Sequence, residues 1–220
     1  MTRSITVSII DRHPAAMIGI ETAFKASRGF DVTSRRLTQD EDESGQIDPI
    51  TSDVVICDDQ AILASLAGHR PTRTSGDDAF VIVAYVAAEF PGIELAALLA
   101  GSNGVISRRM PLSCLVKAVF AALAFPDAFI GARYDRVRPL NLFDLNPGQL
   151  QPEATQLISA CLTCDGWPQR QRLLAENSLL VTTLRDQLLS QSCNTRFDGV
   201  WRSAKEQSMP RLGRSGIETR

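Results

Sequence analysis

The chain has 220 residues, an apolar content of 44% and a formal net charge of −2, values typical of a globular protein. No apolar run approaches the roughly 20 residues that a membrane helix needs, so we expect no membrane span. The five cysteines are odd in number and scattered, and they do not indicate a disulfide framework. The N-terminus lacks the apolar segment of a signal peptide, so we expect a cytoplasmic protein.

The charge is shared unevenly along the chain. Residues 1–147 hold 14 Lys and Arg against 18 Asp and Glu, a balance of −4. Residues 148–220 hold 9 Lys and Arg against 7 Asp and Glu, a balance of +2. An acidic front and a mildly basic back fit a sensor or regulator joined to a binder of polyanions. The basic excess is small and does not by itself establish nucleic-acid binding.

The first 125 residues alternate between strand and helix patterns. Each expected strand is a short apolar run bounded by polar or turn residues, which is typical of strands buried on both faces. The expected strands are Ile5–Ile10, Phe30–Ser34, Val54–Cys57, Phe80–Tyr85 and Gly104–Ser107. The expected helices are Pro14–Ser27, Gln60–Leu66, Ile93–Ala100 and Pro111–Leu123. We predict an α/β fold, a flavodoxin-like doubly wound parallel sheet with strand order 2-1-3-4-5.

The rest of the chain reads as helical. Residues 126–147 mix Pro, Gly, Asn and Arg with scattered aromatic residues, and we interpret them as a linker that partly packs. Helical patterns return at Pro152–Leu162, Trp167–Ala175 and Leu179–Ser190, where Asn177 and Ser178 are suited to cap the last of these. A fourth helix is expected at Phe197–Lys205. The predicted organisation is an α/β domain at 1–125, a linker at 126–147, a small all-α domain at 148–206 and a disordered tail at 207–220.

Acidic side chains end two of the expected strands. Asp11 ends the first strand, and Asp58 ends the third with Asp59 directly after it. Because the carboxyl ends of parallel strands meet at one edge, where doubly wound sheets bind ligands, these acids are expected to share a pocket. Arg12 places a cation beside that pocket.

The segments around this edge resemble the receiver domain of two-component response regulators. The resemblance covers roughly residues 4–124 and rests on Ile10–Pro14, Asp53–Asp58, Val81–Tyr85 and Gly104–Arg108, which stand in receiver order. The Asp-x-His-Pro start and the all-helical back end are similar to the class in which a LuxR- or NarL-type helix-turn-helix follows the receiver. The resemblance implies a transcriptional regulator whose back domain binds DNA, with a partner regulator or kinase as a further partner.

The same resemblance implies a phosphorylation pocket with altered residues. Asp11 matches the first of two acids that hold Mg²⁺, and Asp58 matches the phosphoacceptor. Arg12 replaces the second acid, Tyr85 replaces a Thr or Ser, and Arg108 replaces a Lys. Because a cation at a metal-ligand position adds repulsion, we predict a pocket that is not phosphorylated, in which Arg12 or Arg108 neutralises Asp58. In the alternative interpretation Arg12 points to solvent and the pocket has decayed.

Two hypotheses remain open for the back domain. In the first, the third expected helix reads DNA through Thr182, Thr183 and Arg185, while Arg170 and Arg172 on the preceding helix contact the DNA backbone. In the second, the protein is a receiver-based interaction module, or an antagonist of a true regulator, that does not bind DNA.

The expected helix Pro111–Leu123 is apolar on most of its surface and must therefore be buried or paired. We predict a homodimer, either through the last helix–strand–helix unit of the receiver or through its final helix and the linker.

The remaining motifs carry no clear chemistry. The C-x-x-C of Cys161 and Cys164 has no second ligand pair for zinc, so we interpret both as core cysteines. His13 is interpreted as a surface or capping residue. No nucleotide-binding or hydrolase motif occurs, so we expect no enzyme activity, no cofactor and no metal site.

Overall fold

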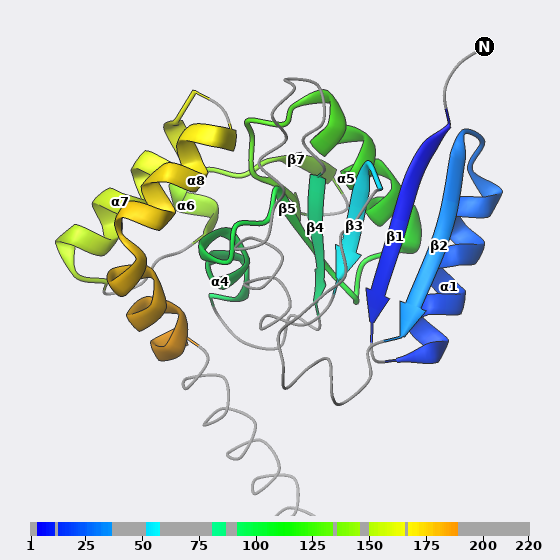
Figure 1. Ribbon diagram of the computed structural model, residues 1–220, viewed down its shortest axis with the longest axis horizontal. Coiled ribbons are helices and arrows are strands. Elements are labelled where there is room, and N and C mark those ends of the chain that lie inside the picture. Colours follow the sequence, from blue (N-terminus) through cyan, green and yellow to red (C-terminus); the bar gives the residue numbers. More distant parts are fainter. Residues whose placement is uncertain are drawn as a thin grey trace, which may run out of the picture.

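The computed structural model describes residues 4–11, 13–36, 52–57, 81–86, 92–133, 136–145, 150–165 and 167–188. The strands of these residues form one sheet with the order β2-β1-β3-β4-β5-β6-β7 (Figure 1). The strands are β1 (Ile5–Asp11), β2 (Phe30–Arg36), β3 (Val54–Cys57), β4 (Val81–Val86), β5 (Gly104–Ser107), β6 (Ile130–Arg133) and β7 (Arg136–Pro139). All neighbours pair in parallel except β6 and β7, which pair antiparallel. The predicted order 2-1-3-4-5 is confirmed.

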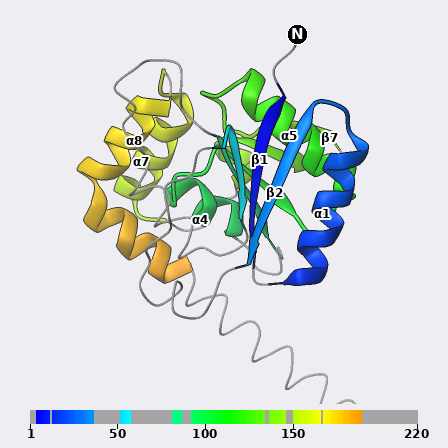
Figure 2. The same cartoon turned by 45° about the vertical axis from the view of Figure 1, so that its right-hand side comes forward.

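Helices cover both faces of the sheet, as a parallel sheet requires (Figures 1 and 2). The helices are α1 (Pro14–Ala26), α4 (Ile93–Leu99), α5 (Leu112–Ala124), α6 (Leu142–Leu145), α7 (Pro152–Thr163) and α8 (Trp167–Glu176), followed by helical residues 178–188. One apolar cluster joins α1 and α5 to the sheet. A second cluster joins α4 and the C-terminal helices to the opposite face.

The alternation of side chains along the central strands explains the two clusters. In β3, Val54 and Ile56 belong to the α1–α5 side, whereas Val55 and Cys57 belong to the α4 side. Every residue of β3 and of β4 is buried. The continuous apolar runs therefore correspond to strands with two covered faces, as predicted.

The segment predicted as a linker extends the sheet instead. Ile130 pairs with Gly104 of β5, and β7 returns beside β6 with Pro139 opposite Ile130. A Cβ atom at Gly104 would lie 2.8 Å from the carbonyl oxygen of Ile130, so only glycine permits this close pairing. Two four-residue strands that contain Gly, Arg and Pro lack an apolar run, which is why the pattern did not predict them.

The C-terminal helices share a core with the sheet and do not form one of their own. Val181, Leu184 and Leu188 are buried in the same cluster as α4. Gly92, just before α4, has φ 92°, and a Cβ atom there would lie 2.8 Å from Cδ2 of Leu188. The expected all-α domain therefore packs directly on the α/β part.

This packing also covers the α4–β5 part of the surface through which we predicted a dimer. The residues of α4 from Leu95 to Leu99 are buried, and β6 occupies the edge of β5. The apolar helix α5 is buried by its contacts with α1 and the last two strands. Most of its apolar character is thus explained within one copy, although Phe120 is 45% exposed.

Three expected segments lie outside the described residues: Gln60–Leu66, Phe197–Lys205 and the tail at 207–220. Within the described part of the chain, no helix is long and apolar enough to cross a membrane.

Candidate functional site

The carboxyl edge of the sheet holds a buried ion pair. Asp11 is the last residue of β1, and its side chain is only 3% exposed. Arg108 follows β5 directly and donates a short hydrogen bond from Nη2 to Oδ2 of Asp11. The other carboxylate oxygen accepts the backbone N–H of His13 at 2.7 Å and lies 3.1 Å from Nδ1 of that residue. Both oxygens of Asp11 are therefore engaged within the chain.

Arg108 also connects this pair to β4. Its backbone N–H donates to the carbonyl of Val86 at 2.8 Å, and its Nε donates to the carbonyl of Tyr85 at 3.4 Å. The guanidinium lies 5.5 Å from the centre of the buried Tyr85 ring, within the range of a cation–π contact. One side chain thus ties the ends of β1, β4 and β5 together.

The structure brings three of the predicted pocket residues together: Asp11, Tyr85 and Arg108. We expected Arg12 or Arg108 to neutralise Asp58; the described carboxylate partner of Arg108 is Asp11. The other three predicted pocket residues, Arg12, Asp58 and Asp59, lie outside the described residues. A divalent cation bound by Asp11 would compete with the guanidinium for the same carboxylate.

The burial of the Arg170 side chain contradicts its predicted contact with DNA. Its side chain is fully buried on α8, where Nε donates to the carbonyl of Cys161 at 2.9 Å and Nη2 donates to the carbonyl of Asp127. Asp127 lies in the turn between α5 and β6, 43 residues earlier in the chain. Arg170 therefore joins the C-terminal helices to the sheet, and no local pattern could reveal that partner.

The predicted recognition helix corresponds to residues 178–188, whose apolar side is buried. The other side is polar: Thr182 and Thr183 are exposed and Arg185 is half-buried. Arg172 on α8 is exposed as well. The predicted DNA-contacting residues other than Arg170 are thus at the surface.

The connection before this helix is very short. Only Asn177 separates it from α8, whereas a helix-turn-helix has a turn of about three to four residues. The side chain of Asn177 donates to the carbonyl of Leu173 at 2.8 Å, so it caps the end of α8 and not the start of the next helix.

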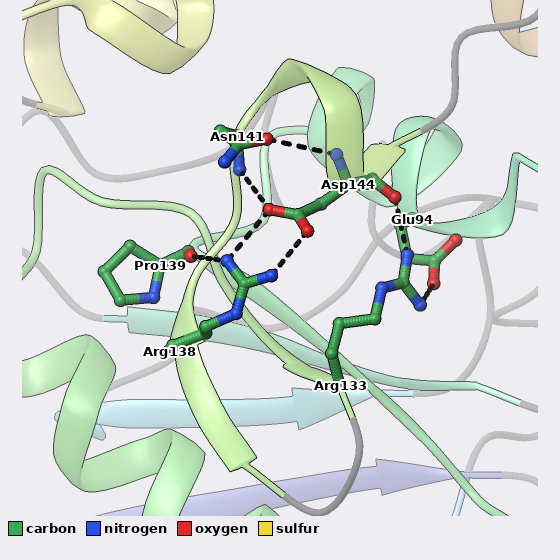
Figure 3. Close-up of polar contacts among 6 residues, drawn as sticks. All are labelled: Glu94, Arg133, Arg138, Pro139, Asn141 and Asp144. Atoms are coloured by element: carbon green, nitrogen blue, oxygen red, sulfur yellow. Dashed lines mark hydrogen bonds and ion pairs between the residues drawn. The ribbon is translucent and has the colours of Figure 1, made fainter.

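A polar network that the sequence analysis missed fastens the β6–β7 hairpin to α4 and α6 (Figure 3). Arg133 donates from Nη1 to Glu94 of α4 at 2.7 Å and from Nη2 to the carbonyl of Asp144 at 2.7 Å. Arg138 forms a two-point ion pair with the Asp144 carboxylate, at 2.9 and 2.5 Å. The hairpin, α4 and α6 are therefore held as one unit.

Asp144 is the centre of this network. It accepts the backbone N–H of Asn141 at 2.9 Å and donates its own N–H to the Asn141 side chain at 3.1 Å, a reciprocal cap of α6 (Figure 3). The hydrogen bonds from Arg138, and next the one from the Asn141 backbone, lower the pKa of Asp144. The Asn-x-x-Asp spacing was the one available signal for this cap.

The C-x-x-C pair lies at the end of α7. Cys161 is buried as predicted, and loss of solvent raises the pKa of its thiol to about 11. Cys164 is partly exposed, and its Sγ donates to the carbonyl of Cys161 at 3.3 Å. Among the residues that the structure describes, no cluster of three or more His, Cys, Asp or Glu side chains could hold a metal ion.

No protein-family model and no curated protein matches the chain. Solved structures of response regulators are similar to it. The RcsB response regulator of Salmonella typhimurium is 17% identical with a TM-score of 0.48, covering 87% of this chain and 91% of that one. A LuxR-family two-component response regulator from Aurantimonas sp. SI85-9A1 is 19% identical with a TM-score of 0.45, covering 55% and 86%. The receiver domain of a NarL response regulator from Mycobacterium tuberculosis is 17% identical with a TM-score of 0.42, covering 56% and 98%. Similarity at this level concerns the fold alone.

Proposed function

We propose that the chain is a regulator of the response-regulator type that works without phosphorylation. The observation that carries the proposal is the buried ion pair of Asp11 with Arg108. Two unit charges about 4 Å apart attract by about 4 kcal/mol at an effective dielectric of about 20, before desolvation. Mg²⁺ would compete with that attraction, and Arg12, the next residue in the sequence, carries a further positive charge. The proposal includes no catalytic activity.

Acetyl phosphate with Mg²⁺ tests the proposal chemically. We expect no phosphoprotein by intact-mass measurement of the full chain. A variant that carries Arg12→Asp, Tyr85→Thr and Arg108→Lys restores all three altered positions of the receiver pattern and serves as the matched comparison. Phosphorylation of the unaltered chain that disappears in Asp58→Ala would overturn the proposal.

We also propose that the protein binds DNA through the polar side of residues 178–188. The exposed Thr182 and Thr183 with the half-buried Arg185 support this, and the exposed Arg172 would add a contact with the DNA backbone. With so few cations on this described surface, the affinity of one copy must be low and its salt slope must be small.

Fluorescence anisotropy on genomic fragments tests the DNA proposal. Arg185→Ala is expected to cost about 1–3 kcal/mol if the side chain reads a base, and Arg172→Ala should lower the salt slope by about one unit. Arg28→Ala, an exposed arginine in the turn between α1 and β2, is the charge-matched control and should change neither value.

A second candidate function is an interaction module without DNA binding. It is favoured by the burial of Arg170 and by the one-residue break at Asn177, which together leave a compact helical cover on α4. Failure of the unaltered chain to bind any fragment at low salt would establish this candidate in place of the DNA-binding one.

A further inference from the structure

The C-x-x-C pair at the end of α7 combines a buried thiol with an accessible one. Cys161 lies on the last turn of α7 and is fully buried, whereas Cys164 directly follows the helix and is partly exposed. The sulfur of Cys164 donates to the carbonyl of Cys161 at 3.3 Å, so it lies against the turn that carries the buried thiol. Neither the proposed phosphorylation-independent regulation nor the proposed DNA binding uses these two thiols.

The spacing of the pair suits a disulfide. Residues 161–163 are helical, and a helical path separates the Cα atoms of residues three apart by about 5 Å on the same side of the helix. Disulfides join Cα atoms about 4.4–6.8 Å apart, so the helical spacing lies within the required range. Cys164 itself has the extended backbone angles φ −69° and ψ 147°. Because the chain leaves the helix at this residue, no further helical turn confines the Cys164 side chain.

The two sulfur groups also influence each other electrostatically. Burial is the main cause that raises the pKa of the Cys161 thiol to about 11; the positive charge of Arg170 opposes this shift, and the nearby Cys164 thiol adds to it. At neutral pH Cys161 therefore stays protonated and is a poor nucleophile toward reagents in solution. Cys164 is the thiol of this pair that an external disulfide can reach.

We propose that Cys161 and Cys164 form a thiol–disulfide exchange site for low-molecular-weight disulfides such as glutathione disulfide. The thiolate of Cys164 attacks one sulfur of the external disulfide, whose S–S bond breaks and releases a first small thiol, which takes up the proton that Cys164 lost. The thiol of Cys161 then gives up its proton and attacks the Cys164 sulfur of the mixed disulfide, and the second small thiol leaves with that proton. Two protein thiols are thereby oxidised to one disulfide, while one external disulfide is reduced to two thiols.

The exchange acts on a contact that fastens the C-terminal helices to the sheet. The carbonyl of Cys161, which accepts the Cys164 thiol, also accepts Nε of the buried Arg170 at 2.9 Å. The same guanidinium donates from Nη2 to the carbonyl of Asp127, in the turn before β6. Arg170 thus joins α8 to the end of the neighbouring α7 and to the sheet (Figures 1 and 2).

Formation of the disulfide disturbs this contact. Because Cys161 is buried in the apolar cluster of α4, its side chain has to turn toward Cys164 when the bond forms. The hydrogen bond from the Cys164 thiol to the Cys161 carbonyl is lost at the same time. Oxidation should therefore loosen the last turn of α7, where Arg170 is anchored.

Intact-mass measurement and peptide mapping of the full chain in glutathione buffers test the proposal. A rising share of glutathione disulfide should lower the mass of the chain by that of two hydrogen atoms, mapping should place the bond between Cys161 and Cys164, and dithiothreitol should reverse it. Cys161→Ala removes the second nucleophile, so its Cys164 should retain one glutathione as a stable mixed disulfide. Cys193→Ser removes a cysteine outside the pair and is the matched control, which should leave the bond unchanged.

An unaltered chain whose mass does not change in oxidising glutathione buffer would overturn the proposal. A bond from Cys164 to any cysteine other than Cys161 would do so too, as would a glutathione adduct on Cys164 that persists in the unaltered chain. These results come from the unaltered chain and therefore do not depend on the folding of a variant.

Hydrogen exchange followed by mass spectrometry tests the effect on the helices. Peptides from residues 161–176 should exchange faster in the oxidised chain, whereas peptides from β1 should not change. Cys164→Ser should exchange equally in both buffers, because it cannot form the bond. Equal exchange of residues 161–176 in the oxidised and reduced unaltered chains would refute the effect on the Arg170 contact. Each failure is separable from the proposed function, because phosphate uptake and DNA binding are measured on the chain reduced with dithiothreitol.

Discussion

Removal of Arg108 is expected to destabilise the fold through the carboxylate that it leaves behind. Arg108→Ala removes the cation beside the Asp11 carboxylate, whose side chain is 3% exposed at the carboxyl edge of the sheet. Breaking a buried pair by removing one partner costs about 3–5 kcal/mol. The lower end applies, because the Arg108 side chain is 21% exposed and the His13 backbone still bonds to Asp11. We therefore expect a loss of about 3 kcal/mol in the free energy of unfolding.

Urea denaturation followed by circular dichroism measures this loss, and the melting temperature should fall by roughly 6–12 °C for a chain of this size. Arg109→Ala removes an exposed neighbouring arginine and is the control, with an expected change within about 0.5 kcal/mol. The double variant Arg108→Ala with Asp11→Asn should recover part of the loss, because it also removes the stranded charge.

A cost below about 0.5 kcal/mol for Arg108→Ala would show that the pair with Asp11 contributes no more than an exposed ion pair does. A double variant that loses the full sum of the two single changes would do the same, because independent sites add.

Three further expectations follow from other contacts. Gly92→Ala should destabilise the packing of the C-terminal helices by at least about 1 kcal/mol, measured by denaturation, because the new Cβ meets Leu188 and φ is positive; an unchanged midpoint would contradict this packing. Asp144→Asn should lower stability at neutral pH, with a difference from the unaltered chain that shrinks as the pH falls below about 4. The sign follows from the lowered pKa: the stabilisation is present above the unfolded value and is lost as the folded carboxylate takes up its proton. A constant difference from pH 7 to pH 3 would contradict it. Cys161, buried and with a raised pKa, should resist alkylation at neutral pH far longer than the partly exposed Cys164, as peptide mass mapping would show; equal rates would count against its burial.

The sheet could be predicted from the sequence because its central strands are continuous apolar runs. Such runs predict burial on both faces, as in the strands Val54–Cys57 and Val81–Val86. The order of the strands along the chain then leaves few possible topologies. The hairpin of β6 and β7 could not be predicted, because its strands are four residues long and include arginines at 133, 136 and 138. Arg133 and Arg138 are satisfied by partners on other elements, Glu94 and Asp144.

The sequence predicted which edge of the sheet carries the candidate site, but it did not predict which side chains pair there. Asp11 and Arg108 are 97 residues apart, and only the parallel topology brings both to the same edge. The topology does not decide which acid the guanidinium contacts, and the expected pairing of Arg12 or Arg108 with Asp58 lies outside the described residues. Arg170 shows the same limit, because its basic side chain on an amphipathic helix indicated a surface, whereas two backbone carbonyls hold it in the core.

The most direct test of the central claim is a calorimetric titration of the full chain with beryllofluoride in the presence of Mg²⁺. This anion mimics a phosphoryl group and needs both the metal and an available acidic pocket. With Asp11 held by Arg108, we expect no Mg²⁺-dependent heat of binding up to about millimolar concentrations. Mg²⁺-dependent binding with a dissociation constant of about 1 µM would contradict it.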